Sequence, residues 1–195
     1  MTHKWLIIFF FSAITGLSCS QKTKTPAFTT PEHKSEFFPV TEFFLGDLNL
    51  LDSLPTTPLK ISTQKGHMDS SWIKKSEVYP EANDFFDPVI DSAHQAPYFT
   101  EKSFLDQTIN LYTLSYDPLN KLPQNTHLKR WDVYIDPKTQ KIARVYIVKK
   151  TVEKEGAVIK HLTWIAGTSF TVVTIIESKN QNPIIHEKKV VWKFN

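Results

Sequence analysis

Apolar and polar residues alternate most regularly over residues 131–194. Trp131, Val133 and Ile135 fall on one face of a strand. Residues 136–140 have the composition of a tight turn, and residues 142–148 return as a second strand. Because connections of a few residues cannot make parallel crossovers, the region predicts an antiparallel β-meander. Further apolar positions continue the pattern at similar spacing: Val158, Leu162, Trp164, Phe170, Val172, Ile176, Ile184, Val190, Trp192 and Phe194.

The segments before the meander predict additional strands. Residues 97–116 are rich in Thr, Tyr, Phe and Ile, which favours two strands or one long bent strand. Residues 59–62 predict a short strand, and the glycine-containing residues 64–67 predict a turn after it.

Two stretches of the N-terminal half predict helices. Residues 41–54 place Phe and Leu side chains on one helical stripe, with Thr41 as the N-cap and Pro55 after the end. A second helix is expected over residues 80–86, with Pro80 at its first position. Together these elements predict an α+β fold, in which a sheet of about five to seven strands from the C-terminal half is covered by one or two helices.

The N-terminus has the layout of a secretory signal peptide. Lys4 precedes an unbroken apolar run over residues 5–11, and small or weakly polar residues follow up to Cys19. Even counted generously, the apolar part covers 13 residues, fewer than the roughly 20 that a transmembrane helix needs. We therefore expect a cleaved signal.

The residues Gly16, Leu17, Ser18 and Cys19 resemble the lipobox of bacterial lipoprotein precursors. The resemblance implies that Cys19 becomes the mature N-terminus and carries fatty acyl chains that hold the protein on a membrane. Ser20 stands where lipoproteins of the inner membrane have aspartate, so the resemblance implies the outer membrane of a Gram-negative bacterium. The alternative is a soluble secreted protein that is cut elsewhere and in which Cys19 is incidental. Cys19 is the sole cysteine of the chain, so no disulfide explains it.

These features predict a simple domain organisation. Residues 1–18 are the signal peptide, residues 19–36 are the lipidated N-terminus and a polar, proline-containing tether, and residues 37–195 form a single α+β domain. A hydrophobic content of 41% and an aromatic content of 13% exclude an intrinsically disordered chain.

Charge is distributed unevenly along the chain. Residues 19–120 hold 14 acidic and 8 basic residues, whereas residues 121–195 hold 6 acidic and 14 basic residues. The two parts can attract each other inside one fold or present a dipolar surface to a partner. Arg130 and Arg144 are the only arginines, which argues against a nucleic-acid partner, and the lysines predict solvated strand faces.

Motifs for catalysis and metal binding are absent from the sequence. No G-x-S-x-G, H-E-x-x-H or paired-cysteine pattern occurs, so we expect no enzyme activity, no cofactor and no metal. One polar cluster, His67, Asp69 and Ser70, could serve a hydrolase, although a polar turn explains the same residues. Asp84, Asp87 and Asp91 have a spacing that could bind a hard cation, but Pro88 interrupts the helix that would align them.

The function predicted from these observations is that of a non-catalytic envelope lipoprotein, anchored through Cys19 and acting as a binding or structural module. Its expected partners are the membrane and either an envelope protein or an apolar ligand. The first alternative is a carrier for a lipid or other apolar ligand within a concave sheet. A weaker alternative is a hydrolase that uses His67 and Asp69. The aromatic residues expected to line the carrier's cavity are Tyr112, Tyr116, Tyr134, Tyr146, Trp164, Phe170 and Trp192.

Overall fold

The structure is a computed structural model that describes residues 37–119, 122–123, 126–179 and 181–193. The expected lipobox and the expected tether lie outside these residues. All described residues belong to one compact unit.

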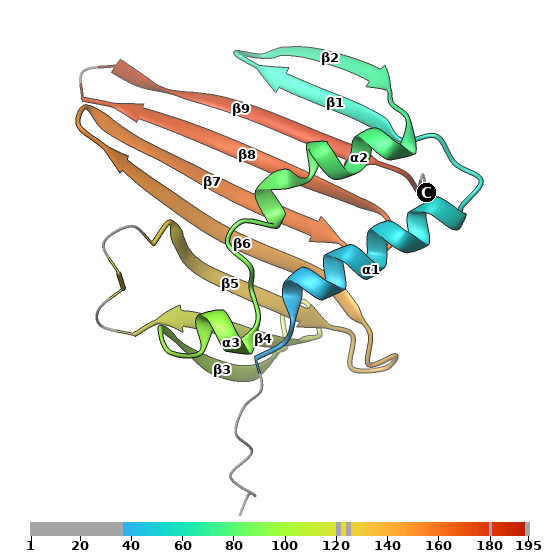
Figure 1. Ribbon diagram of the computed structural model, residues 1–195, viewed down its shortest axis with the longest axis vertical. Coiled ribbons are helices and arrows are strands. Elements are labelled where there is room, and N and C mark those ends of the chain that lie inside the picture. Colours follow the sequence, from blue (N-terminus) through green and yellow to red (C-terminus); the bar gives the residue numbers. More distant parts are fainter. Residues whose placement is uncertain (1–36, 120–121, 124–125, 180, 194–195) are drawn as a thin grey trace, which may run out of the picture. The chain divides into compact units, whose positions relative to one another are not determined.

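A nine-stranded antiparallel sheet is the main element of this unit (Figure 1). Its strand order is β2-β1-β9-β8-β7-β6-β5-β4-β3, so every pair of consecutive strands from β3 to β9 is also adjacent in space. The strands are β1 (Leu59–Gln64), β2 (His67–Trp72), β3 (Phe99–Asp106), β4 (Leu111–Pro118), β5 (Leu128–Ile135), β6 (Ile142–Glu153), β7 (Gly156–Ile165), β8 (Ser169–Ser178) and β9 (Gln181–Val191).

The predicted meander is confirmed for β5 to β9, but the sheet is larger than the expected five to seven strands. Residues 97–116 provide the two strands β3 and β4, which extend the sheet beyond β5. The hairpin of β1 and β2 extends it at the other side, because β1 pairs with β9 from Leu59 opposite Val191 to Gln64 opposite His186. Lys65 and Gly66 form the hairpin turn with positive φ angles of 49° and 78°.

Three α-helices and a 3₁₀ turn lie on one face of the sheet (Figure 1). They are α1 (Val40–Ser53), α2 (Lys75–Glu81), η1 (Asn83–Phe85) and α3 (Ser92–Gln95), so the expected one or two helices are too few. The predicted N-cap is also wrong. Thr41 lies inside α1, and its hydroxyl oxygen instead accepts the N–H of Ile90 at 2.8 Å.

The second predicted helix begins earlier in the chain than expected. α2 starts at Lys75, and Pro80 lies near its end, not at its first position. The start is stabilised by the side chain of Glu77, which accepts the N–H of Lys74 at 2.6 Å. Pro80 is tolerated because α2 ends one residue later and the chain continues as η1.

Aromatic side chains fill the space between α1, η1 and the sheet. Phe44 of α1 lies 4.7 Å from Trp164 and 5.2 Å from Phe85 between ring centroids. Trp164 also stacks on Phe170 at 5.4 Å. Tilted and edge-to-face contacts of this kind add to the stability from burying apolar area. The largest fully buried side chains are Trp131, Trp164, Trp192, Tyr116, Phe44, Phe85 and Phe170.

A buried carboxylate fixes α1 to this core. Asp47 is 6% exposed, and its carboxylate accepts the indole N–H of Trp164 at 2.6 Å and the backbone N–H of Gly167 at 2.8 Å. Gly167 has a φ of 64°, which suits the turn between β7 and β8. The interaction therefore joins a helix to a strand and to the turn that follows the strand.

We expect Asp47→Ala to lower the free energy of unfolding by about 3 kcal/mol, because the buried indole N–H of Trp164 and the partly buried N–H of Gly167 lose their acceptor. Urea unfolding followed by tryptophan fluorescence measures the change. The matched control is Asp52→Ala on an exposed position of the same helix, for which we expect a change within about 0.5 kcal/mol. Equal losses for the two variants would contradict the role of Asp47.

Candidate functional site

Four lysines lie on the side of the sheet that faces the helices. Lys60 belongs to β1, Lys188 to β9, Lys160 to β7 and Lys149 to β6. Lys149 and Lys160 are cross-strand neighbours. Lysine is rarely placed in a helix–sheet layer unless its ammonium group finds partners there.

The segment that leads from the end of α2 through η1 to Pro88 provides those partners. The Glu81 carboxylate lies 2.6 Å from the ammonium group of Lys60 and 3.2 Å from that of Lys188. The Asp84 carboxylate lies 2.6 Å from the ammonium group of Lys160. Acidic residues of the first part of the chain thus bind lysines of the last part, as one of the two alternatives for the charge asymmetry predicts.

Lys149 is the most deeply buried of the four lysines. It is 7% exposed, and its ammonium group donates to the backbone carbonyls of Asp84 and Asp87. Burial lowers the pKa of Lys149 from 10.5 to about 8, against the opposing effect of the Asp84 and Asp87 charges. At pH 8 a lysine with the ordinary pKa of 10.5 would be almost fully charged, whereas Lys149 would be about half charged.

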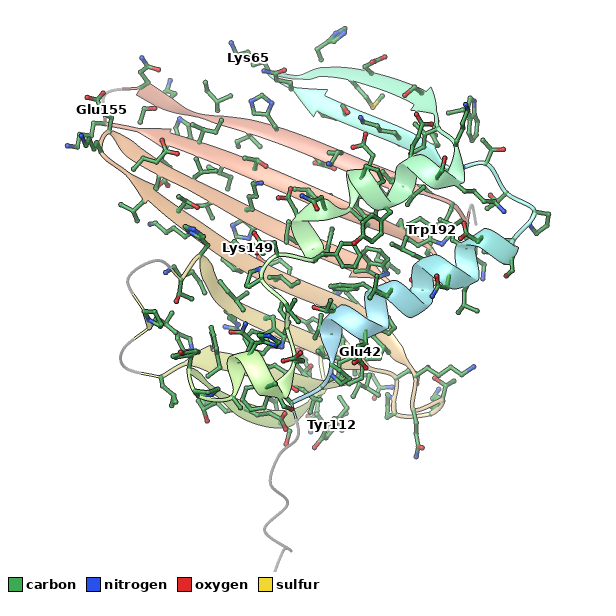
Figure 2. The ribbon with its side chains drawn as sticks, viewed as in Figure 1. Glu42, Lys65, Tyr112, Lys149, Glu155 and Trp192 are labelled. Atoms are coloured by element: carbon green, nitrogen blue, oxygen red, sulfur yellow. The ribbon has the colours of Figure 1, made fainter. Side chains whose placement is uncertain are left out.

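Lys149 forms part of the wall of a pocket of about 480 Å³. Figure 2 shows its side chain beside the segment that links α2 to α3. A pocket of this size is within the range of small-molecule sites. Its other lining residues are Asp84, Asp87, Pro88, His94, Gln95, Tyr98, Thr126, His127, Thr151, Val158 and Lys160.

The lining offers hydrogen-bond donors and acceptors in similar numbers. The lining includes two lysines and two aspartates, so the formal charges cancel when the histidines are neutral. His127 and Thr151 contact each other, with 3.2 Å between the ring Nδ1 and the hydroxyl oxygen. Tyr98 is exposed and presents both a phenol group and an aromatic ring. The pocket can therefore bind hydroxyl groups in either hydrogen-bonding direction.

The predicted polar cluster does not form a site of this kind. His67, Asp69 and Ser70 all lie on β2, an exposed edge strand. Because side chains alternate along a strand, His67 and Asp69 point to one face and Ser70 points to the other. The Asp69 carboxylate accepts the backbone N–H of Ser70 at 2.9 Å, so its hydrogen bond is made within the same strand.

The three aspartates considered for a cation also have separate roles. Asp84 pairs with Lys160, the backbone carbonyl of Asp87 accepts from Lys149, and Asp91 caps α3 by accepting the N–H of His94 at 2.8 Å. Among the described residues, no group of three His, Cys, Asp or Glu side chains could hold a metal ion.

The seven aromatic residues proposed for a carrier do not surround one cavity. Tyr116, Trp164, Phe170 and Trp192 are buried in the core. Tyr134 and Tyr146 alternate with the buried Val133 and Ile147 and lie on the opposite face of the sheet. Tyr112 is exposed near the start of β4.

Both arginines lie on that opposite face, away from the pocket. Arg130 donates to the buried carboxylate of Asp132, with 3.0 Å between Nη2 and Oδ1, and the guanidinium of Arg144 stacks 4.1 Å from the ring centroid of Tyr134. The face without helices thus has its own polar and aromatic interactions.

Sequence reasoning did not single out Lys149, Lys160 or His127. A signal for Lys149 was present, because its position continues the inward alternation of Val145 and Ile147 along β6. A charged residue at an inward position indicates a paired or functional side chain, whereas the sequence analysis assigned lysines to solvated faces. Asp84 and Asp87 were recognised, but their lysine partners were not.

Comparison with protein-family models, with curated proteins and with solved structures finds no match for this chain. Within the part of the chain that the structure describes, no helix has both the length and the apolar character required to cross a bilayer. The geometry of the Lys149 pocket is therefore the main guide to function among the described residues.

We expect Lys149 to make folding stability rise with pH. The folded chain releases the Lys149 proton near pH 8, whereas the unfolded chain keeps it to about pH 10.5, so the unfavourable burial of the charge disappears as pH rises. Between pH 7 and 9.5 the free energy of unfolding of the wild type should increase by about 2 kcal/mol relative to Lys149→Met.

Urea unfolding of the two proteins across this pH range measures the difference. Lys102→Met is the control, because Lys102 pairs with Asp117 on an exposed part of β3. A constant difference between the wild type and Lys149→Met would contradict the lowered pKa.

Proposed function

We propose that this chain is a lipid-anchored envelope protein, attached to the outer membrane through Cys19, whose folded domain is a non-catalytic binding module. The proposed site is the Lys149 pocket, and the proposed ligand is small, electrically neutral and rich in hydroxyl groups, such as a saccharide. The observation that carries the proposal is a buried lysine at the wall of a pocket in which donors and acceptors are balanced.

The charge balance of the pocket supports this class of ligand. A phosphate or carboxylate would gain from Lys149 and Lys160 but would meet the carboxylates of Asp84 and Asp87. A neutral hydroxyl-rich molecule can donate to the carboxylates and accept from the ammonium groups at the same time. The exposed ring of Tyr98 adds an apolar surface against which the face of a sugar ring can pack.

The contacts of Lys149 support a binding role over a catalytic one. A nucleophilic lysine needs a free amine near a general base. Here the ammonium group is directed to two backbone carbonyls, and its neighbour Lys160 is paired with Asp84. Two of the three N–H groups of Lys149 are thus engaged, which leaves one to donate to a ligand but no free amine for nucleophilic attack.

The carrier alternative and the hydrolase alternative have less support. The aromatic residues of the first are divided between two faces of the sheet, and four of them fill the core. The hydrolase alternative depends on His67 and Asp69, which lie on an exposed edge strand and do not line the Lys149 pocket.

Titration calorimetry with glucose, galactose, N-acetylglucosamine and trehalose tests the ligand class, with inorganic phosphate and glutamate as charged comparisons. We expect at least one neutral sugar to bind more tightly than either anion. Lys149→Met should weaken that binding by about 10- to 100-fold, the effect of losing one charge-assisted hydrogen bond.

Two further variants separate binding from folding. Lys188→Met also removes an anchor of the same segment but lies outside the pocket, so its affinity should stay within about threefold of the wild type. Thr151→Val removes one hydroxyl of the pocket wall and should weaken binding several-fold without unfolding the chain. Preferential binding of phosphate, or equal effects of the Lys149 and Lys188 variants, would refute the assignment.

The lipid anchor has a separate test. In a Gram-negative host, the wild type should fractionate with the outer membrane and carry acyl chains on Cys19, as measured by mass spectrometry of its N-terminal peptide. Cys19→Ser should be released into the soluble fraction, because acyl chains contribute about 0.8 kcal/mol of membrane affinity per buried CH₂ group. An unmodified Cys19 thiol in the wild type would refute the anchor and leave the pocket assignment untouched.

A further inference from the structure

The strand β2 forms one edge of the sheet, and no strand of the described residues pairs with its outer side (Figure 1). All of its residues are exposed, including Met68 at 68% and Trp72 at 65%. Edge strands are normally protected by proline, by lysine or by a β-bulge, because their outer N–H and C=O groups can pair with another chain. β2 contains no proline or lysine, and its pairing with β1 is regular along its whole length. The strand therefore has the properties of a docking edge.

The register of the hairpin decides which backbone groups of β2 point outward. A two-residue turn joins β1 to β2, so the pair that closes the turn is hydrogen-bonded and every second pair after it is hydrogen-bonded as well. The N–H of Ile73 donates to the C=O of Pro58 at 2.9 Å, one pair beyond the end of the ladder, which agrees with this alternation. The residues between these pairs direct their N–H and C=O groups away from β1: Met68, Ser70 and Trp72.

Two copies of β2 are complementary to each other when they pair antiparallel about Ser70. In this register Ser70 lies opposite Ser70 of the second copy, and Met68 lies opposite Trp72 of the second copy, so all outward backbone groups of the strand are used. The thioether of methionine and an aromatic ring attract each other at this separation. On the other face Asp69 lies opposite Ser71 of the second copy, whose hydroxyl group can donate to the carboxylate.

The carboxylate of Asp69 favours this register over its neighbour. If the strands were shifted so that Asp69 lay opposite Asp69 of the second copy, two like charges would be directly opposed, which destabilises a strand pair. In the single chain the carboxylate accepts the N–H of Ser70 at 2.9 Å and so covers one outward donor. In the pair, that N–H instead donates to the C=O of Ser70 in the second copy, and the carboxylate accepts from Ser71 of the second copy.

The opposite edge of the sheet has a different character. It is formed by β3, which contains Lys102, and the ammonium group of this lysine lies 3.0 Å from the carboxylate of Asp117. A lysine on an edge strand opposes the addition of another strand. Of the two edges, β2 is therefore the one suited to pairing.

We propose that the domain forms a symmetric dimer through β2, in which a second copy of this chain continues the sheet across a two-fold axis at Ser70. The interface is separate from the Lys149 pocket, because no residue of β2 lines that pocket.

Sedimentation velocity of the chain carrying Cys19→Ser measures the association at about 10 to 500 μM, because a one-strand interface is small and should bind weakly. We expect a reversible equilibrium between monomer and dimer. Met68→Lys places a charge in the interface and should weaken dimerisation about tenfold or more. The matched control is Leu105→Lys on β3, where the leucine is 49% exposed, and its dimerisation should stay within about threefold of the parent chain.

Single cysteines test the register, because the Cys19→Ser chain has no other cysteine. Ser70→Cys should form a disulfide-linked dimer on mild oxidation, since the Cα atoms of a directly opposed, hydrogen-bonded pair lie about 5.5 Å apart, a distance that a disulfide spans. The matched control is Ser103→Cys, at an exposed position of β3, which should stay monomeric.

Several results would overturn the proposal. One is a monomer over the whole concentration range, and another is an equal effect of Met68→Lys and Leu105→Lys. A disulfide between Ser70→Cys and Ser103→Cys in a mixture of the two variants, without a disulfide between two Ser70→Cys chains, would also overturn it, because β3 of a second copy would then occupy the edge. All substituted side chains are exposed, so circular dichroism should show every variant folded.

Discussion

The placement of four lysine side chains on the sheet face that carries the helices, with Lys149 buried and the other three partly exposed, is the constraint on which the rest of the domain depends. The ammonium group of Lys149 must find an acceptor, since an unpaired buried charge would destabilise the fold by several kcal/mol, and the other three are also paired. The segment Glu81–Asp87 satisfies this requirement with two carboxylates and with the backbone carbonyls of Asp84 and Asp87. The path of the chain between α2 and α3 is therefore set by electrostatics as much as by apolar packing.

The layer between the helices and the sheet has two regions, one held by aromatic packing and one held by polar contacts. Where Phe44 and Trp164 meet, aromatic rings exclude water and the carboxylate of Asp47 fixes α1 to the turn after β7. Where Lys149 and Lys160 lie, the chain above the sheet is held by polar contacts, which leave an open pocket with donors and acceptors. A mainly apolar pocket, lined by Leu51, Leu54 and Trp192 among others, borders the first region, and the polar pocket borders the second. One layer thus borders two pockets with different linings.

The strands of the sheet were the easiest elements to predict. Alternation of apolar residues identified β5 to β9, because each of these strands packs one face against a hydrophobic core and its connections are short. The helix boundaries were harder. Thr41 has the chemistry of an N-cap and Pro80 that of a first helical residue, yet Thr41 accepts a hydrogen bond from Ile90, far along the chain, and Glu77 starts α2 before the proline. Local preference of a few tenths of a kcal/mol to about 1 kcal/mol was outweighed by specific tertiary contacts.

The sequence alone determined the class of fold, the antiparallel meander and the likeness of its first residues to a lipoprotein signal, since each depends on local order along the chain. The tertiary structure decided the number of strands, because β1 pairs with β9 from more than a hundred residues away. The tertiary structure also decided which residues form the Lys149 pocket. Asp84 was visible as an acidic residue, but its partner Lys160 and the burial of Lys149 depend on which strand positions the segment after α2 crosses. Contacts between residues distant in sequence have no local pattern, and both pockets are built from such contacts.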